Sequence, residues 1–293
     1  MHTRGAENFD HYGRETTRLV NETFDSGVSR AVLLMRHSAR TFTPGIHDME
    51  NLLTDHGRGL SRRMGQEMLN RLSVRGYASP VDRCLETAQL VIEGHVETGG
   101  QGHRTRPVEA LGVFYALDQQ KMWKGMSQAD SMVDYIDQWF DGAVPPDALM
   151  PAELAVQMVV RALLGKLSGP MPEHPAGQGH LDLCVSHDFT VFAVRHGLGL
   201  EPLDGPEVEF LDGLLLFERE GEHFMRSQNG SEVKITTCPS SWRHSRPKSS
   251  RTACADGRGA RDVVQEGGIE RFDDPSEHDG QNGYGALAPL GCC

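Results

Sequence analysis

The stretch Ala31-Val32-Leu33-Leu34-Met35-Arg36-His37-Ser38-Ala39-Arg40 decides the fold of this chain. Five apolar residues end abruptly in a cationic segment with a histidine in its middle. Short unbroken apolar runs are typical of parallel strands that are covered on both faces. In open α/β sheets the ligand crevice lies outside the carboxyl ends of such strands. We therefore predict a buried strand that places His37 at the ligand-binding end of a sheet.

Two arginines, Arg36 and Arg40, flank this histidine. A guanidinium stays charged, and its planar fork matches the oxygens of phosphate or carboxylate. The residues therefore predict an anionic ligand, and we expect a phosphoryl group. The formal net charge of −12 argues against nonspecific binding of nucleic acid, which needs an excess of lysine and arginine. The anion is then expected in a local positive cleft within an acidic molecule.

Length and composition indicate one large domain with an appendage, since the chain has 293 residues. Its six cysteines show no C-x-x-C spacing, which favours reduced thiols in the cytoplasm. The first residues lack the apolar core of a signal peptide, and the chain lacks an apolar run of about 18 residues that would span a membrane. We expect a soluble, cytoplasmic protein without a membrane partner. The sequence leaves the oligomeric state open.

A second apolar run, Leu181-Asp182-Leu183-Cys184-Val185-Ser186, predicts another strand that ends in a histidine, His187, followed by Asp188 and a helix. Between the two strands, apolar residues at helical spacing from Leu60 predict one amphipathic helix. A second predicted helix follows Ser79-Pro80 and carries Arg83. Residues 94–107 are rich in glycine, histidine and charge, and they predict an exposed loop.

The remaining segments set the predicted domain limits. Residues 1–28 are expected to form an N-terminal arm with one short helix, and residues 29–238 the catalytic domain. Aromatic residues within about 114–150 predict a helical cap insertion, either as a small local core or as a lining of the substrate pocket. Residues 239–293 lack apolar periodicity and are expected to be a disordered tail.

Four spaced motifs together resemble the histidine phosphatase superfamily, also called phosphoglycerate mutase-like. The resemblance covers roughly residues 31–220. It implies an α/β fold with three layers, α/β/α, a mostly parallel central sheet and a small helical cap. The motifs are Arg36-His37, Leu53-Thr54 with Gly57, Ser79-Pro80 with Arg83 and Glu86-Thr87-Ala88, and Ser186-His187-Asp188.

The resemblance also implies roles for residues. His37 matches the nucleophile that forms a phosphohistidine, and Arg36, Arg40, Arg83 and His187 match positions of the phosphate pocket. The His187-Asp188 pair is similar to the acid phosphatase branch and makes Asp188 the expected proton donor. In this branch's Arg-His-Gly-x-Arg-x-Pro pattern, however, Ser38 stands in place of glycine and Phe42 in place of proline.

Several alternatives stay open from the sequence. Glu109 lies roughly where the mutase branch carries its glutamate, and an aspartate at the position of Asp188 can also cap a helix. The expected activity is hydrolysis of a phosphomonoester, either a phosphorylated small molecule or a phosphopeptide. The alternatives are a phosphomutase and a catalytically weak scaffold that binds phosphorylated ligands. No second ligand pair accompanies Cys184 and His187, so we expect neither a metal site nor a cofactor.

Overall fold

The apolar run before His37 forms strand β1 (Arg30–Arg36), and residues 31–35 are completely buried. The structure is a computed structural model that describes residues 11–43, 45, 47–172, 178–200, 208–228 and 230–236. All of these lie within the unit Met1–Ser240. The tail predicted over residues 239–293 lies outside the described residues.

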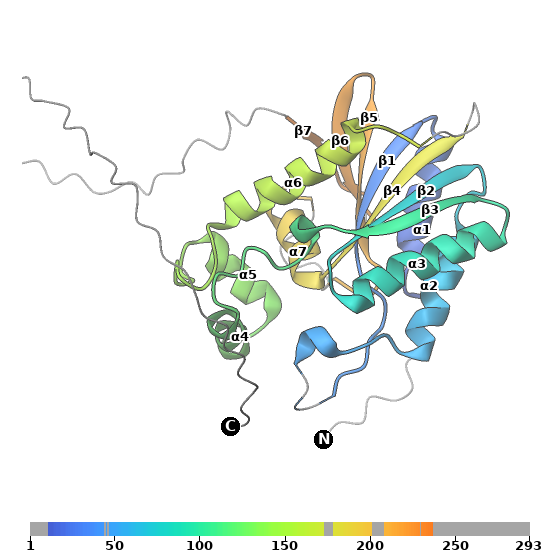
Figure 1. Cartoon of the computed structure of the whole chain (residues 1–293). Helices are drawn as coiled ribbons and strands as arrows, with labels where there is room; N and C mark the ends of the chain where they lie inside the picture. Colours follow the sequence, from blue (N-terminus) through green and yellow to red (C-terminus); the bar gives the residue numbers. More distant parts are fainter. Residues whose placement is uncertain are drawn as a thin grey trace, which may run out of the picture. The chain divides into compact units, whose positions relative to one another are not determined.

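Strand β1 is the centre of a seven-stranded sheet with the order β3-β2-β4-β1-β5-β6-β7 (Figure 1). It runs parallel to β4 (Gly179–Ser186), which is parallel to β2 (Leu72–Ala78), and β2 is parallel to β3 (Gln101–Pro107). On the other side of β1 the sheet continues antiparallel through β5 (Gly213–Arg219), β6 (Glu222–Ser227) and β7 (Glu232–Ile235). The parallel half therefore contains both strands that end in a histidine.

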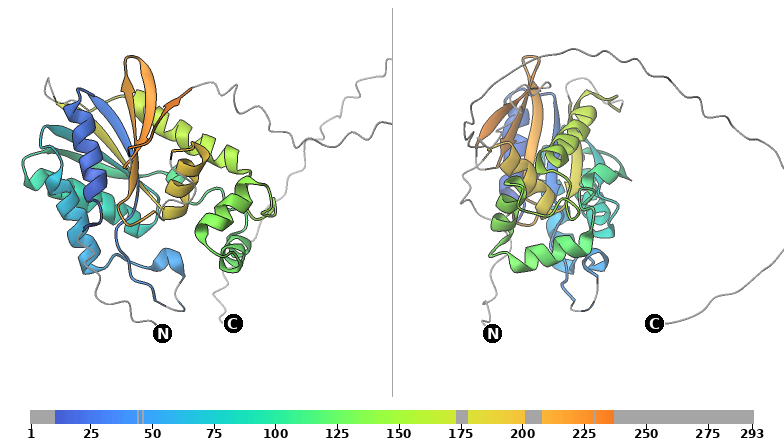
Figure 2. Two further views of the ribbon diagram at one scale, coloured as in Figure 1. Left: turned by 180° about the vertical axis from the view of Figure 1, so that it is seen from behind. Right: turned by 90° about the vertical axis from the view of Figure 1, so that its left-hand side faces the viewer.

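Helices cover both faces of the sheet (Figure 2). Helices α1 (Arg14–Asp25), α2 (Asp55–Glu67) and α3 (Asp82–Glu97) pack against the side chains of Ala31, Leu33 and Met35. Side chains alternate along a strand, so Val32 and Leu34 face the opposite layer. That layer contains α6 (Ala152–Ser168) and α7 (Asp188–Gly197). The predicted α/β fold with three layers is confirmed.

The N-terminal segment contributes to the core. Within the range predicted as an arm, α1 buries Leu19, Val20 and Phe24 in the same apolar cluster as β1. These three side chains lie on one side of the helix, which gives it an amphipathic pattern.

The prediction of an exposed loop over residues 94–107 is wrong. Helix α3 continues to Glu97, and β3 occupies Gln101–Pro107. Strand β3 is an edge strand that pairs only with β2, and its side chains are half-buried or exposed. An edge strand tolerates charged side chains because one of its edges faces solvent. Its composition therefore resembles that of a loop.

The predicted insertion forms α4 (Gln119–Gln128) and α5 (Met132–Phe140), which lie beyond the sheet, with α5 beside α7 and α4 next to α5 (Figure 1). Trp139 stacks on Phe189 of α7, with ring centroids 5.4 Å apart, and Tyr115 lies 5.4 Å from Trp139. The aromatic pattern thus forms a local core. That core supports the helix that begins at Asp188.

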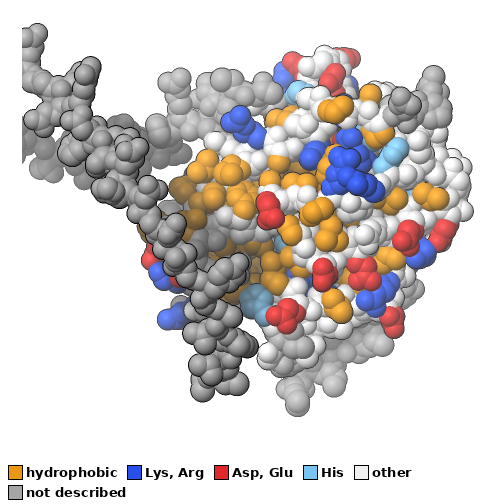
Figure 3. Space-filling view, in the orientation of Figure 1, with side chains coloured by type: hydrophobic (Ala, Val, Ile, Leu, Met, Phe, Trp, Pro, Cys, Tyr) orange, Lys and Arg blue, Asp and Glu red, His pale blue; other side chains and the backbone are white. Residues whose placement is uncertain are grey.

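The surface is uneven in character. On the face drawn in Figure 3, hydrophobic side chains gather on the side where α6 lies, and lysine and arginine side chains form a separate compact group. Helix α6 exposes Leu154 and Met158. Among the described helices, none combines the length and the apolar character that a membrane crossing requires.

Candidate active site

The two histidines predicted at strand ends meet in the structure. The register of β1 on β4 pairs Arg36 with Ser186, so His37 and His187 leave the sheet at the same level. Their ring centroids lie 5.7 Å apart with the rings nearly perpendicular. Both imidazoles are buried, with exposed fractions of 2% and 4%. Parallel pairing of two sequence-distant strands therefore builds the centre of the site.

The turn that carries His37 is held by two helices. The backbone N–H of Ser38 donates to Oγ1 of Thr87 on α3 at 3.1 Å, and Oγ of Ser38 donates to the carbonyl of Gly57 on α2 at 2.7 Å. A Cβ atom on Gly57 would lie only 2.1 Å from the carbonyl oxygen of Ala39. Glycine is thus required for α2 to approach this turn so closely.

Hydrogen bonds define the state of the His37 ring. Its Nδ1 lies 2.8 Å from the carbonyl oxygen of Ser38, which can only accept, so Nδ1 carries the proton. The Nε of Arg83 donates to Nε2 of His37 at 3.1 Å. Burial, followed by the charge of Arg83, holds the pKa of His37 well below its usual value of 6.5. The imidazole is therefore neutral, with its Nε2 lone pair directed at a guanidinium.

Two of the predicted phosphate-binding arginines converge on one carboxylate. Nη2 of Arg83 lies 3.0 Å from Oδ2 of Asp48, and Nη2 of Arg40 lies 2.6 Å from Oδ1 of the same residue. The backbone carbonyl of Asp48 accepts a further hydrogen bond from Nη1 of Arg83 at 2.7 Å. The carboxylate of Asp48 thus lies between the two guanidiniums, and Arg83 contacts both this carboxylate and the His37 ring.

His187 borders the same space. Its Nε2 lies 3.0 Å from Oγ of Ser79, which directly follows β2. Burial, with the charge of Arg83 second, lowers the pKa of His187 to about 4. The thiol of Cys84 lies 3.8 Å from the same ring nitrogen, and burial raises the pKa of this thiol to about 12. Cys84 is therefore an uncharged, unreactive neighbour.

The third predicted arginine, Arg36, pairs with Asp188. Its Nη2 lies 2.9 Å from Oδ2 of Asp188, its Nη1 donates to the carbonyl of Val208 at 2.6 Å, and its guanidinium lies 4.1 Å from the ring centroid of Phe210. Oδ1 of Asp188 accepts from the backbone N–H of Phe189 at 2.8 Å. Both carboxylate oxygens of Asp188 thus have partners at the start of α7: one pairs with Arg36 and the other accepts a backbone hydrogen bond.

Glu109 lies on a separate wall of the site. It belongs to a short 3-10 helix (Glu109–Leu111), is exposed, and lines a hollow of about 510 Å³. The same hollow is lined by Ser79, by Met49 next to Asp48, and by Phe114 of the insertion. It therefore opens beside Ser79, whose hydroxyl contacts the His187 ring, and Glu109 lies on its wall.

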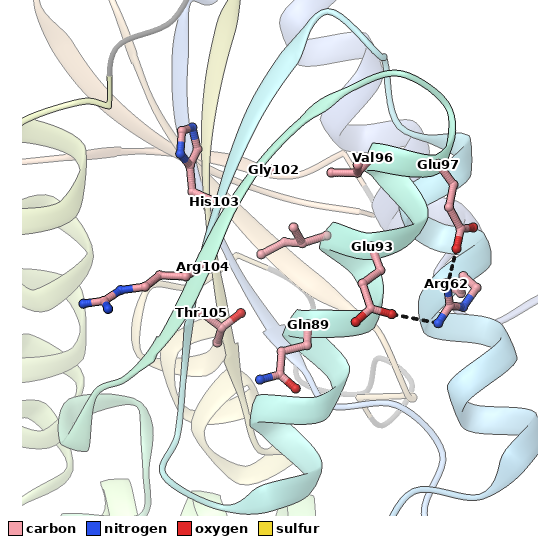
Figure 4. Close-up of a pocket in the computed structure, with 10 residues that line it drawn as sticks. Arg62, Gln89, Glu93, Val96, Glu97, Gly102, His103, Arg104 and Thr105 are labelled. Atoms are coloured by element: carbon pink, nitrogen blue, oxygen red, sulfur yellow. Dashed lines mark hydrogen bonds and ion pairs between the residues drawn. The ribbon is translucent and has the colours of Figure 1, made fainter.

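A larger hollow, of about 760 Å³, lies between α3 and the edge strand β3 (Figure 4). Arg62 of α2 pairs with Glu93, at 2.7 Å, and with Glu97 of α3. These charged residues of the wall of the hollow therefore form ion pairs with one another. Strands β2 and β4 separate β3 from β1. This hollow is therefore not part of the site that contains His37.

Sequence reasoning missed Asp48 and Phe210. Asp48 belongs to a stretch of sequence with no periodic pattern, and a lone aspartate among other polar residues gives no indication of its role. Phe210 stands at the start of an apolar stretch of sequence, where an aromatic residue is expected to be part of the core. It comes shortly after residues 201–207, which the structure does not describe. Both residues act through distant partners, which a motif cannot identify.

Comparisons with known proteins add solved structures that the chain resembles. No family model matches the sequence, and no curated protein matches it. Phosphoglycerate mutase from Bacillus anthracis str. Sterne is 17% identical, with 69% of this chain and 94% of that chain covered and a TM-score of 0.43. Phosphoserine phosphatase from Entamoeba histolytica is 13% identical, with coverages of 71% and 95% and a TM-score of 0.41.

Mycobacterial glucosyl-3-phosphoglycerate phosphatase, solved with inorganic phosphate, is 16% identical, with 71% of this chain and 96% of that chain covered and a TM-score of 0.43.

Proposed function

We propose that the protein hydrolyses phosphoric monoesters through a phosphohistidine formed on Nε2 of His37. The observation that carries the proposal is the arrangement of three groups. The Nε2 lone pair of a buried neutral imidazole faces Arg83, and Arg83 shares one anion with Arg40. A nucleophile next to a site that already holds an anion is what phosphoryl transfer to nitrogen requires.

The first chemical step forms the N–P bond. The Nδ1–H to Ser38 hydrogen bond directs the reactive lone pair of His37 to Nε2. As Nε2 attacks phosphorus, the bond from phosphorus to the ester oxygen breaks and the leaving oxygen takes a proton. Water then attacks the phosphohistidine, which releases inorganic phosphate and restores the neutral ring. The low pKa of His37 keeps the ring unprotonated before attack.

Charge on the transferring group would be stabilised by Arg83, Arg40 and His187. Arg83 is 2% exposed, and a buried guanidinium interacts more strongly with an anion than one in water does. Removal of one preorganised donor from a site that stabilises developing negative charge costs about 10²- to 10³-fold in rate. The cluster of Arg83, Arg40 and His187 would therefore stabilise the transition state of the proposed reaction.

The hollow beside the site is suited to the leaving group. Its volume of about 510 Å³ lies within the range of small-molecule pockets. This favours a phosphorylated small molecule over a phosphopeptide as the substrate. Asp188 and Glu109 are the candidate donors for the leaving oxygen. Asp188 would have to separate from Arg36 to act, whereas Glu109 lines the hollow itself.

Rapid quenching in alkaline denaturant tests the proposal. Wild-type protein mixed with p-nitrophenyl phosphate carrying a labelled phosphoryl group should retain label that is lost in acid and kept in alkali. His37→Ala should retain none and should turn over no substrate. His56→Ala serves as the matched control, because His56 is an exposed histidine on α2.

Circular dichroism and thermal melting would establish that His37→Ala is folded, and His37→Asn provides a second variant of similar shape. Full turnover by a folded His37 variant would refute the nucleophile assignment. Exchange of the label between phosphate esters that exceeds hydrolysis would instead indicate a phosphomutase. Binding of phosphate without a labelled intermediate would indicate a binding scaffold.

A further inference from the structure

We propose that Asp48 is an internal anion that holds the phosphoryl position of the free protein and is replaced by the phosphoryl group of the ligand. The proposal concerns regulation of the site described above and rests on the proposed function only in taking that group to be a phosphoryl group. It assigns to Asp48 a competing role, which neither the motifs nor the comparisons suggest.

The first support is the geometry of the ion pairs. Each carboxylate oxygen of Asp48 pairs with a different guanidinium, Oδ1 with Arg40 at 2.6 Å and Oδ2 with Arg83 at 3.0 Å. Two oxygens of one phosphoryl group can make the same two contacts, since guanidiniums bind carboxylate and phosphate oxygens alike. The carboxylate of Asp48 thus occupies the position expected of a bound phosphoryl group.

The second support is the burial of Arg83. Its side chain is 2% exposed, and an unpaired guanidinium at that depth would be strongly destabilising. The side chain of Asp48 is itself 21% exposed and provides the compensating charge when no ligand is bound. A dianionic phosphoryl group would provide the same compensation with more charge.

The third support is the state of the nucleophile. Nε of Arg83 donates to Nε2 of His37 at 3.1 Å while two other nitrogens of the same guanidinium hold Asp48. With its lone pair engaged in this way, His37 is not free to attack phosphorus. A ligand that takes Arg83 away from Asp48 would also release the lone pair. The free protein is therefore in a resting state.

The fourth support is the weak attachment of Asp48 compared with that of its partners. Asp48 belongs to a 3-10 helix of three residues, Asp48–Glu50, none of which is buried. Arg83 lies on the 16-residue helix α3, and Arg40 is fixed by a β-bridge to the buried Leu53. Displacement of the carboxylate disturbs no core packing, whereas displacement of the buried Arg83 would. The carboxylate is the partner that can move.

An occupied site weakens the apparent affinity of a ligand in proportion to the fraction of protein in the competent state. Neutral replacement of Asp48 should therefore strengthen binding of phosphate. If Asp48 occupies the site in about nine molecules of ten, the gain is about tenfold. Loss of a nearby negative charge by itself also favours phosphate, and the same charge change at Glu50, an acid of the same short helix, measures that general effect.

Calorimetric titration of the full chain with inorganic phosphate tests the proposal without any need for turnover. Asp48→Asn should bind phosphate about tenfold more tightly than the wild type, and Asp48→Ala should change in the same direction. Glu50→Gln is the matched control, because Glu50 is an exposed acid of the same short helix and should leave the affinity unchanged.

Thermal melting supplies a second readout. Without phosphate, Asp48→Asn should melt at a lower temperature than Glu50→Gln, and saturating phosphate should raise its midpoint by more than it raises that of the wild type. Equal or weaker phosphate binding by the folded Asp48 variants, or no binding by any variant, would overturn the proposal. Tighter binding by Asp48→Asn in a protein that forms no labelled intermediate would support the proposal and refute the phosphatase.

Discussion

The Nε atom of Arg83 lies 3.1 Å from Nε2 of His37, so a permanently charged group donates directly to the nitrogen proposed as the nucleophile. The hydrogen bond requires that Nε2 be unprotonated. It also connects the nucleophile to the anion held by Arg83 and Arg40, because all three nitrogens of the Arg83 guanidinium are used, one on His37 and two on Asp48. One side chain thus couples the state of the nucleophile to the occupancy of the anion site.

Replacement of Arg83 should therefore affect both rate and binding. We expect Arg83→Ala to lower kcat/KM for p-nitrophenyl phosphate by at least about 10²-fold, because a preorganised donor to the transferring group is lost. Arg83→Lys should recover only part of the activity, since one ammonium cannot contact His37 and the anion through separate nitrogens. Steady-state kinetics provide the measurement. Arg71→Lys, at a partly exposed arginine, is the control, and an Arg83→Ala variant as active as this control would contradict the prediction.

The proton donor can be identified with leaving groups of different basicity. An acid is important for an alkyl phosphate and nearly irrelevant for an activated aryl phosphate. If Asp188 is the donor, Asp188→Asn should lose alkyl phosphatase activity far more than aryl activity, and Glu109→Gln should lose neither. Rates with both kinds of substrate provide the measurement. The reverse pattern would assign the role to Glu109, which lines the hollow beside the site.

Stability should depend on pH through His187. Burial lowers the pKa of this residue in the folded state from 6.5 to about 4. Between these values the unfolded chain binds a proton that the folded chain does not, so stability falls as the pH is lowered from 6.5 toward 4. At 1.36 kcal/mol per pKa unit, the loss is roughly 3 kcal/mol.

We expect His187→Gln to lose less stability than the wild type between about pH 7 and about pH 4.5, as measured by urea unfolding at both values. Part of the loss should remain in the variant, because the pKa of His37 is also held well below 6.5. His56→Gln, at an exposed position, is the control. An equal loss in the His187 variant and in the control would show that His187 is not the cause.

Two glycines of α2 provide a matched test of how this helix supports the turn that carries His37. A Cβ atom at Gly57 would meet the carbonyl oxygen of Ala39 at 2.1 Å, whereas one at Gly59 meets no atom within 4 Å. Gly57→Ala should lower the free energy of unfolding by about 1–3 kcal/mol and reduce activity, because α2 must move away from the turn. Gly59→Ala should raise that free energy by up to about 1 kcal/mol through helix propensity. Similar effects of both changes would argue against a close approach at Gly57.

Much of the fold follows from local patterns. The unbroken apolar run before His37 and the mostly apolar segment before His187 predict two buried strands, and these are β1 and β4. The helical spacing from Leu60 predicts α2. Such signals are local because a strand buried on both faces is mostly apolar along its length. The buried Asp182 of β4 is tolerated because it pairs with Arg75. Strand β3 escaped prediction because an edge strand is not under that constraint.

For the site, the sequence by itself determined which residues can act: a histidine between two arginines, a second strand-end histidine, and Arg83 on a helix after Ser79-Pro80. Only the tertiary structure decided how they pair. Arg36 lies against Asp188, Arg83 reaches His37, and the carboxylate of Asp48 lies between Arg40 and Arg83. Ion pairs between distant positions depend on strand register and on the closeness of helices, and these follow from packing of the whole core rather than from any one stretch of residues.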